Sequence, residues 1–278
     1  MEIRKVGVIG SGLMGSGIAE TFARHGFDVV VREIDERTLE AGRGRVRASM
    51  ERGLARGKLT QEAFDSAWAN LRFTTDLETM ADRDLVVEAI VENPRLKHDL
   101  FRDLDRITPG HAILASNTSS LSITEMAAAT QRPEQIIGMH FFNPVPVMPI
   151  VEIVRGLLTS DATFQTIADL SQGLGKEVVV AQDVPGFIVN LLLIPYLLDA
   201  VRALEMGVAS KEDIDKAIRL GLNHPMGPFT LLDFVGLDTT LFIADAMHAE
   251  LKDSRYAAPT LLRRMVTAGL YGRKVGHG

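Results

Sequence analysis

The chain has 278 residues, enough for one large or two ordinary domains, and its 46 % hydrophobic and 24 % charged content is usual for a soluble globular protein. The net charge of −6, without a basic run, argues against a nucleic-acid partner and gives no reason to expect a membrane-surface role. The absence of cysteine excludes disulfides and thiolate chemistry and is compatible with the reducing cytoplasm, where we expect the protein.

The first predicted element is a buried strand over residues 6–9 that runs into a glycine-rich turn and a helix. Gly10, Gly12 and Gly15 fit the pattern G-x-G-x-x-G, and apolar residues at every fourth position from Met14 predict the helix. Glycine allows a tight turn, the approach of a pyrophosphate to the backbone, and close packing of helix on strand. The positive end of the helix then faces the diphosphate. The alternative interpretation is an ordinary glycine-rich loop.

The second predicted strand, residues 29–31, is followed by Glu33, eighteen residues after Gly15. An acidic side chain at this place accepts hydrogen bonds from the adenosine ribose and repels a 2′-phosphate, which favours NAD over NADP. Arg32 leaves NADP as an alternative, because a guanidinium beside the ribose tolerates the extra phosphate. Otherwise Glu33 is a solvated carboxylate at the end of a strand.

Helices and strands then alternate along the chain. A charged helix over 35–57 carries the run Arg43, Arg45, Arg47, Arg52 and Arg56, which is most simply a solvated face, with contact to a polyanionic ligand as the alternative. Thr60 is the expected N-cap of a helix that reaches Asn70. Further strands are predicted at 73–76 (or a turn), 85–92, 113–116, 136–140, 150–154 and 178–180, with helices over 93–107 and 161–174. This alternation predicts an α/β fold with a Rossmann-like, doubly wound, mostly parallel sheet.

Three polar residues lie where these strands are expected to end. Glu92 closes the run 85–92, Ser119 follows the strand 113–116, and His140 ends the strand 136–140. Ligands of doubly wound sheets bind outside the carboxyl ends of the strands. The sequence therefore predicts a functional site at this edge. The seven histidines show no metal-ligand spacing, so we expect no metal.

The character of the chain changes near 183–186, after which no convincing strand is visible. We expect an NAD-binding domain over 1–185 and a helical substrate and dimerisation domain over 186–278. The helix predicted at 187–206 is apolar on nearly every side, with a kink at Pro195, and such a helix must be buried. A small domain has little other structure to bury such a helix, so we favour a homodimer over burial of the helix within the domain alone. Further helices are expected to begin at Ser210, Gly227, Asp238 and Pro259.

His140 is the expected general base. Oxidation of an alcohol requires a base for the hydroxyl proton, and histidine has an unperturbed pKa near neutrality. Glu152 follows at the start of the next strand, where a His–Glu pair would fix the imidazole tautomer and stabilise imidazolium. Ser119 and Asn190 are expected to hydrogen-bond and polarise the substrate oxygen. The alternatives are a structural histidine, a serine that starts a turn or caps a helix, and an asparagine that joins two helices.

Six segments in order resemble the L-3-hydroxyacyl-CoA dehydrogenases over nearly the whole chain: Gly10–Gly15, Val87–Asn93, Ser116–Leu121, Gly138–Met148, Pro185–Asn190 and His224–Phe229. The resemblance implies reversible, NAD-dependent oxidation of an (S)-3-hydroxyacyl-CoA, with a short chain such as 3-hydroxybutyryl-CoA expected. It also implies a Rossmann-like domain followed by a helical domain that dimerises. The phosphates of CoA would give the arginine-rich residues 43–58 a role.

The resemblance implies the same catalytic residues, namely His140 paired with Glu152, and Ser119 and Asn190 around the substrate oxygens. Together with the glycine motif, it leads us to expect cofactor binding by Gly10, Gly12, Leu13, Met14, Gly15, Glu33, Glu92, Lys97, Asn117 and Asn143.

Two departures from the family pattern stand out. Leu191 occupies a position where the family usually has arginine, and the chain stops at Gly278 where relatives continue into an aromatic pair. One alternative function is a free 3-hydroxyacid dehydrogenase related to 6-phosphogluconate dehydrogenase, but the lysine used by such enzymes one turn before the asparagine is missing here. The other is a non-catalytic NAD-binding relative, similar to the lens λ-crystallins.

Overall fold

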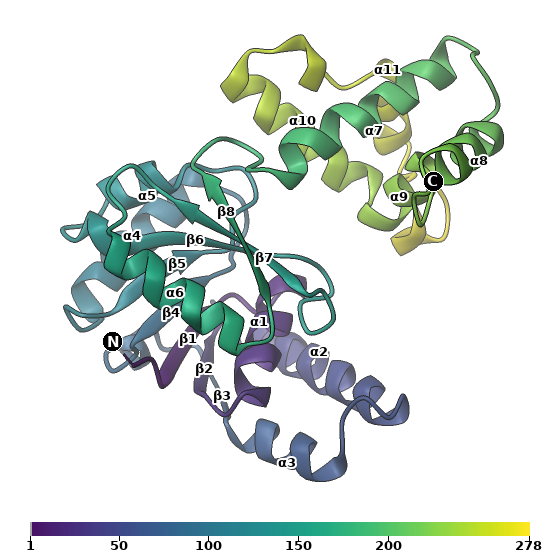
Figure 1. Ribbon diagram of the computed structural model, residues 1–278. Coiled ribbons are helices and arrows are strands. Elements are labelled where there is room, and N and C mark those ends of the chain that lie inside the picture. The colour runs from purple at the N-terminus through teal and green to yellow at the C-terminus, as the bar shows by residue number, and fades with distance from the viewer. Residues whose placement is uncertain (1) are drawn as a thin grey trace. The chain divides into compact units, whose positions relative to one another are not determined.

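The computed structural model describes residues 2–278, and the chain divides into two compact units, Met1–Asp183 and Val184–Gly278 (Figure 1). The first unit is built on a sheet with the strand order β3-β2-β1-β4-β5-β6-β7-β8. Its strands are β1 (Lys5–Ile9), β2 (Asp28–Arg32), β3 (Leu71–Thr74), β4 (Leu85–Glu88), β5 (Ile113–Ser116), β6 (Ile136–Phe141), β7 (Ile150–Arg155) and β8 (Glu177–Gln182). The mostly parallel α/β sheet expected from the sequence is confirmed.

All neighbouring strands in this sheet run parallel except β6 and β7, which are antiparallel. The reason is the connection between them. Only residues 142–149 join the two strands, and a parallel crossover needs a dozen residues or more. The start of β7 therefore lies beside the end of β6, at the edge of the sheet where the functional site was expected.

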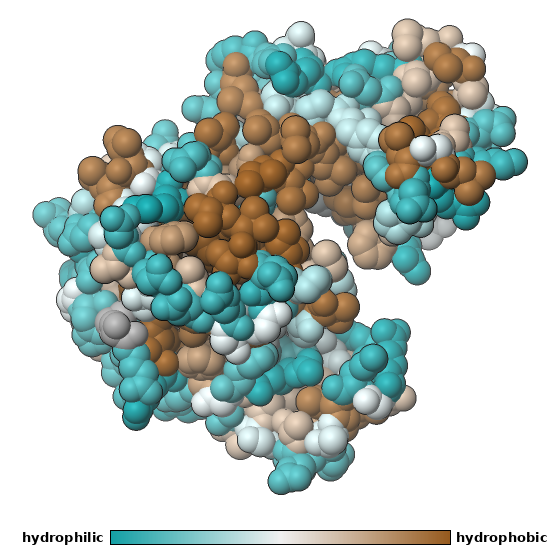
Figure 2. Space-filling model, in the orientation of Figure 1, coloured by the Kyte–Doolittle hydropathy of each residue, from teal (hydrophilic) through white to brown (hydrophobic). Residues whose placement is uncertain are grey.

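The helices of this unit are α1 (Leu13–Arg24), α2 (Glu36–Ala55), α3 (Gln61–Ala69), α4 (Pro94–Ile107), α5 (Ile123–Ala128) and α6 (Asp161–Gly173), with 3-10 turns at Leu77–Met80 and Pro133–Gln135. The central strands are covered on both faces: Leu85, Val86 and Val87 on β4 are all fully buried. This is why the sequence shows continuous apolar runs there and no alternation. β8, by contrast, lies at one edge of the sheet, and its Val180 is 47 % exposed. Apolar side chains gather on the surface over this strand (Figure 2).

One strand boundary differs from the prediction. β4 ends at Glu88, so Glu92 lies in the following loop and does not close a strand, as we had expected. The chain turns away there because Glu88 Oε1 accepts a hydrogen bond from the Ile90 N–H at 2.7 Å. The remaining boundaries agree within a few residues, and Thr60 caps α3 by accepting from the Ala63 N–H.

The second unit is helical, with α7 (Val189–Glu205), α8 (Lys211–Gly221), α9 (Pro228–Val235), α10 (Leu237–Leu251) and α11 (Thr260–Thr267), and 3-10 turns at Ser254–Tyr256 and Arg273–Val275. Pro195 lies inside α7 and lacks the N–H that would bond to the carbonyl four residues earlier. That carbonyl, on Leu191, accepts instead from the Tyr256 hydroxyl at 3.2 Å. The proline is thus accommodated by a side chain from another segment.

Candidate active site

The glycine-rich turn between β1 and α1 shows steric requirements for glycine at Gly10 and Gly15 and open space at Gly12. Gly10 has a φ of +90°, and a Cβ there would lie 2.6 Å from the Ala89 carbonyl oxygen. A Cβ on Gly15 would lie 1.8 Å from the Gly10 oxygen, so this glycine lets helix and strand pack closely. A Cβ on Gly12 would meet no atom within 4 Å, so here the absent side chain leaves open space. These features fit the cradle that a dinucleotide diphosphate requires.

Glu33 is in contact with this turn. Its Oε1 accepts hydrogen bonds from the Ser11 backbone N–H at 2.5 Å and from Ser11 Oγ at 3.0 Å. Arg32 points to a different partner, because its Nε donates to the Thr75 carbonyl at 3.2 Å. One donor of this guanidinium is therefore used by the backbone after β3, which weakens the argument for NADP.

A buried charge cluster lies beyond the end of β4. The Lys97 ammonium, 1 % exposed, is 2.8 and 2.9 Å from the two oxygens of Glu88 and 2.9 Å from Glu92 Oε2. Burial alone would lower the pKa of Lys97, but the two carboxylates outweigh it and raise that pKa. Burial alone would raise the pKa of Glu92, but Lys97 and hydrogen bonds from the loop after β5 outweigh it and lower that pKa.

Sequence reasoning missed Glu88. It is fully buried and also accepts a hydrogen bond from Ser116 Oγ at 2.6 Å, so it joins the ends of β4 and β5 to α4. The available signal was a single charge inside the apolar run 85–91, which requires a buried partner.

Glu92 holds the loop that carries Ser119. Its Oε1 accepts from Thr118 Oγ1 and from the Ser119 backbone N–H, each at 2.8 Å. The Ser119 hydroxyl lies 3.5 Å from the same oxygen. The structure therefore brings Glu92 and Ser119 together at the edge of the sheet where the sequence analysis had placed them, and Lys97, expected only from the family resemblance, joins them through Glu92.

His140 and Glu152 are directly opposite one another on β6 and β7. His140 Nδ1 lies 2.6 Å from Glu152 Oε2, and the two residues are 7 % and 0 % exposed. Asn117 supports this strand end, because its Oδ1 accepts from the Phe141 N–H at 2.9 Å. A short bond between an imidazole and a buried carboxylate can hold a base in one orientation.

Asn143 lies in the connection after β6, before a cis bond to Pro144. It borders a cavity of about 320 Å³ that also includes Leu13 at the start of α1. Sequence reasoning missed Lys176, whose ammonium donates to the carbonyls of Val145 (2.6 Å) and Met148 (2.7 Å) and so holds this connection. Burial lowers the pKa of Lys176.

The arginines of α2 are not simply a solvated face. Arg43 lies over the Phe73 ring and Arg47 over the Trp68 ring, while Arg45 donates to the Ser11 carbonyl. Arg45 and Arg52 also line the cavity of about 320 Å³. The expectation of a purely solvated face was therefore wrong for Arg43, Arg45 and Arg47, while contact with a polyanionic ligand stays a prediction.

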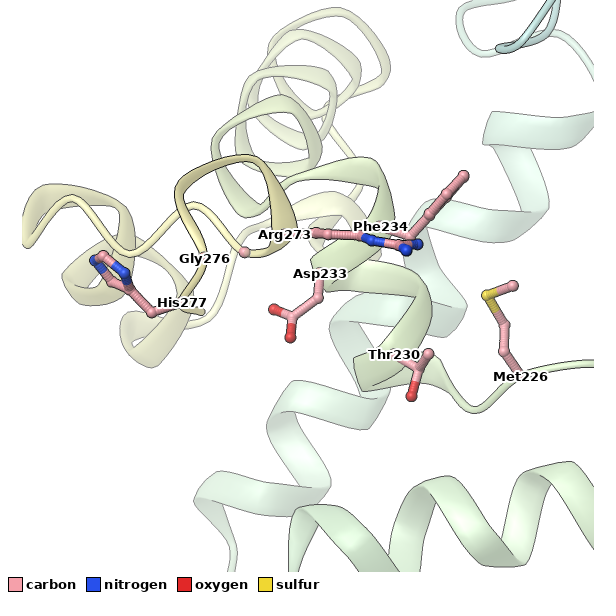
Figure 3. A pocket seen from close by; sticks show the side chains of 8 residues that line it. Met226, Thr230, Asp233, Phe234, Arg273, Gly276 and His277 are labelled. Atoms are coloured by element: carbon pink, nitrogen blue, oxygen red, sulfur yellow. The ribbon is translucent and has the colours of Figure 1, made fainter. Parts of the chain in front are cut away.

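In the second unit, Asn190 is buried in the first turn of α7. A separate cavity of about 370 Å³ lies near Asp233 and Arg273 (Figure 3). It includes none of the predicted site residues. Among residues 2–278, no group of three or more His, Asp and Glu side chains is arranged to hold a metal ion, and no helix there is long and apolar enough to cross a membrane.

Comparison with known proteins matches both units. Residues 5–184 match the family model "3-hydroxyacyl-CoA dehydrogenase, NAD binding domain", and residues 186–278 match "3-hydroxyacyl-CoA dehydrogenase, C-terminal domain". A 3-hydroxybutyryl-CoA dehydrogenase of Mycobacterium tuberculosis is 51 % identical, over 99 % of this chain and 97 % of the relative.

Two crystal structures are closely similar to the whole chain. That of FadB2 from M. tuberculosis has a TM-score of 0.98 and 50 % identity, covering 100 % of this chain and 98 % of the other. That of (S)-3-hydroxybutyryl-CoA dehydrogenase from Ralstonia eutropha has a TM-score of 0.94 and 43 % identity, with the same coverage.

Proposed function

The chain belongs to the 3-hydroxyacyl-CoA dehydrogenase family, and from this premise we propose that it catalyses the reversible, NAD-dependent oxidation of (S)-3-hydroxyacyl-CoA to 3-oxoacyl-CoA. The observation that carries the proposal is the pair His140–Glu152, with 2.6 Å between Nδ1 and Oε2. A family member that only binds NAD has no need of a buried histidine that is held by a buried carboxylate. A short acyl chain is supported by the names of the relatives, which are 3-hydroxybutyryl-CoA dehydrogenases.

The roles of the two residues follow from their hydrogen bond. An ionised carboxylate only accepts, so Nδ1 of His140 carries the proton and Nε2 keeps its lone pair. Nε2 takes the proton of the substrate hydroxyl, and Glu152 stabilises the imidazolium that forms. Bound NAD+ supplies the acceptor for the hydride. In the reverse direction His140 returns the proton to the oxygen of the 3-oxoacyl group.

Ser119 and Asn190 are proposed to hydrogen-bond the reacting oxygen and the neighbouring carbonyl. For Ser119 the support is its loop, which Glu92 holds through the backbone N–H. We assign the cofactor's diphosphate to the turn Gly10–Gly15, including Leu13 and Met14, and its ribose to Glu33. The nicotinamide side is assigned to Glu92, Lys97, Asn117 and Asn143.

For the phosphates of CoA we propose the arginine-rich residues 43–58. Arg45 and Arg52 support this, because both line the cavity that Asn143 borders. Phosphate is bound well by the planar donors of guanidinium groups.

We further propose a homodimer formed through the second unit, in the cytoplasm. The support for dimerisation is apolar surface on that unit, where Leu192, Met206 and Val208 are each about two thirds exposed or more. Apolar side chains of this kind are buried in subunit interfaces. Sedimentation of the purified protein at several concentrations measures this.

The decisive experiment is the oxidation of NADH with acetoacetyl-CoA, followed by absorbance. We expect rapid turnover, slower turnover with NADPH, and a chain-length preference when longer 3-oxoacyl-CoA substrates are compared. Free 3-hydroxybutyrate with NAD+ is the matched control and is expected to be inactive. Protein that binds NADH but turns over no acyl-CoA would instead be a non-catalytic relative, and turnover of the free acid would favour the 3-hydroxyacid dehydrogenases.

A further inference from the structure

The carbonyl of Ser11, in the middle of the glycine-rich turn, is held by an arginine from another helix. Arg45 of α2 donates to this oxygen from Nε at 3.0 Å and from Nη2 at 2.8 Å. Ser16 donates a third hydrogen bond from Oγ at 2.6 Å, and Ser11 itself is fully buried. Two donors of one rigid guanidinium on a single carbonyl restrain both its position and its direction.

α2 also packs tightly against the same residue. A Cβ on Gly42 would lie 1.8 Å from Ser11 Oγ, so only glycine allows this approach. Gly42 and Arg45 are three residues apart and therefore share one face of the helix. On the other side, Glu33 accepts from the Ser11 backbone N–H. The turn is thus held between the end of β2 and one face of α2.

We propose that Arg45 is a positioning residue that keeps the turn Gly10–Gly15 in its cofactor-binding shape, and that through it the affinity for NAD(H) depends on what occupies the neighbouring cavity. The proposal rests on the proposed function, because it takes this turn to bind the cofactor. The proposal explains why Arg45 hydrogen-bonds a carbonyl 34 positions earlier in the chain, although the charges of α2 alone predict a solvated face.

The dependence on the cavity follows from the unused donors of Arg45. This side chain lines the cavity of about 320 Å³ beside Ser49 and Arg52. Its bonds to Ser11 use Nε and Nη2, and Nη1 has no hydrogen bond to any of residues 2–278. An anionic group in the cavity can accept from Nη1 while the other edge still holds Ser11. Because the guanidinium is rigid, an anion bound at Nη1 also restrains the edge that holds the Ser11 carbonyl. We therefore expect bound CoA to increase the affinity for NADH.

The first test is the Kd of NADH, measured by fluorescence titration of the full-length protein. Arg45→Met is expected to weaken NADH binding about tenfold to a hundredfold, since two charge-assisted hydrogen bonds to the turn are lost. ADP-ribose, which carries the same diphosphate, should weaken by the same factor. Arg45→Lys should be intermediate because one ammonium replaces the fork. The control is Arg106→Met on α4, which removes the same charge from an exposed side chain paired with Asp103.

Melting curves separate this effect from unfolding: Arg45→Met loses two hydrogen bonds to the turn and should melt somewhat lower, but every variant should still be fully folded at the temperature of the titration. In the second test, NADH is titrated with and without saturating CoA. We expect CoA to lower the Kd of NADH about fivefold or more for the wild type and to leave it unchanged for Arg45→Met.

Equal NADH affinity of the wild type and Arg45→Met would overturn the positioning role. A CoA effect that is missing from the wild type, or the same in both proteins, would overturn the link to the cavity. If the wild type itself fails to bind NADH, the proposed function fails, so the two failures are distinguishable.

Discussion

Replacing Glu152 by glutamine tests whether this residue orients His140, the proposed catalytic base. The variant keeps the size and shape of the side chain but removes its charge. We expect kcat with acetoacetyl-CoA to fall about 10²–10⁴-fold. The Kd of NADH should stay near the wild-type value, because Glu152 has no part in the glycine-rich turn.

The magnitude follows from the geometry. The bond between His140 Nδ1 and Glu152 Oε2 is 2.6 Å long, and the carboxylate is fully buried. A hydrogen bond to a charged group contributes about 1.5–3 kcal/mol, which corresponds to about 10- to 100-fold in rate if it is lost when the imidazolium forms. Glutamine adds a second effect. Its amide can donate to Nδ1, and this selects the tautomer in which Nε2 carries the proton and cannot act as a base.

The assay compares steady-state kcat and NADH titrations for the wild type, Glu152→Gln and His140→Ala. Glu177→Gln is the matched control, because Glu177 is an exposed glutamate on β8, the strand next to β7. Glu152→Asp, which keeps the charge, should retain more activity than Glu152→Gln. Turnover of Glu152→Gln at the wild-type rate, with His140→Ala inactive, would show that the base needs no carboxylate partner and would refute the reasoning.

Three further substitutions test the surroundings of the site. Lys97→Met should lower the free energy of unfolding, measured in urea, by about 3–5 kcal/mol, because it leaves buried carboxylates without a counterion. The double variant with Glu88→Leu should recover much of this loss. A Lys97→Met protein as stable as the wild type would contradict the argument. Glu33→Ala should narrow the preference for NAD over NADP in kcat/KM, and an unaltered ratio would speak against its ribose contact. Burial raises the pKa of Glu20, so the folded state binds its proton more tightly than the unfolded chain does, and the ionised group destabilises the fold at neutral pH. Glu20→Gln should therefore melt higher than the wild type at pH 7, with a difference that vanishes as the pH falls below the unfolded value of 4.5; an advantage that persisted in acid would exclude this cause.

Features set by local rules could be predicted from the sequence. The glycine-rich turn depends on backbone conformation and close approach, and Gly10 and Gly15 show both requirements. Helix starts were equally accessible: Ser210 was expected to cap a helix, and its hydroxyl does accept from the Asp213 N–H. The sequence signals for these features, the glycine spacing and the serine before the helix, lie within a few residues of one another, although the contact that excludes a side chain at Gly10 comes from the distant Ala89.

Features that depend on distant partners were not accessible in the same way. Glu88 stands in an apolar strand and Lys97 on a helix with a polar face, and only the packing of α4 beside β4 joins them. Arg45 is one of several arginines on a charged helix, and nothing in the local pattern distinguishes it from the others. The bond to Ser11 exists because α2 approaches the turn at Gly42, which is a property of the tertiary fold.

The proposed catalytic pair, His140 and Glu152, lies between these two cases. The sequence suggested His140 and Glu152 as partners, but a parallel β7 would have placed them at opposite edges of the sheet. The short antiparallel return puts them directly opposite on one face, and a slip of one residue would turn Glu152 to the other face. Two residues outside the chemistry secure this register. A Cβ on Gly138 would lie 2.7 Å from that of Val154, its partner on β7, and Lys176 holds two carbonyls of the connection. The orientation of the His140 imidazole therefore depends on backbone contacts as much as on the carboxylate that it touches.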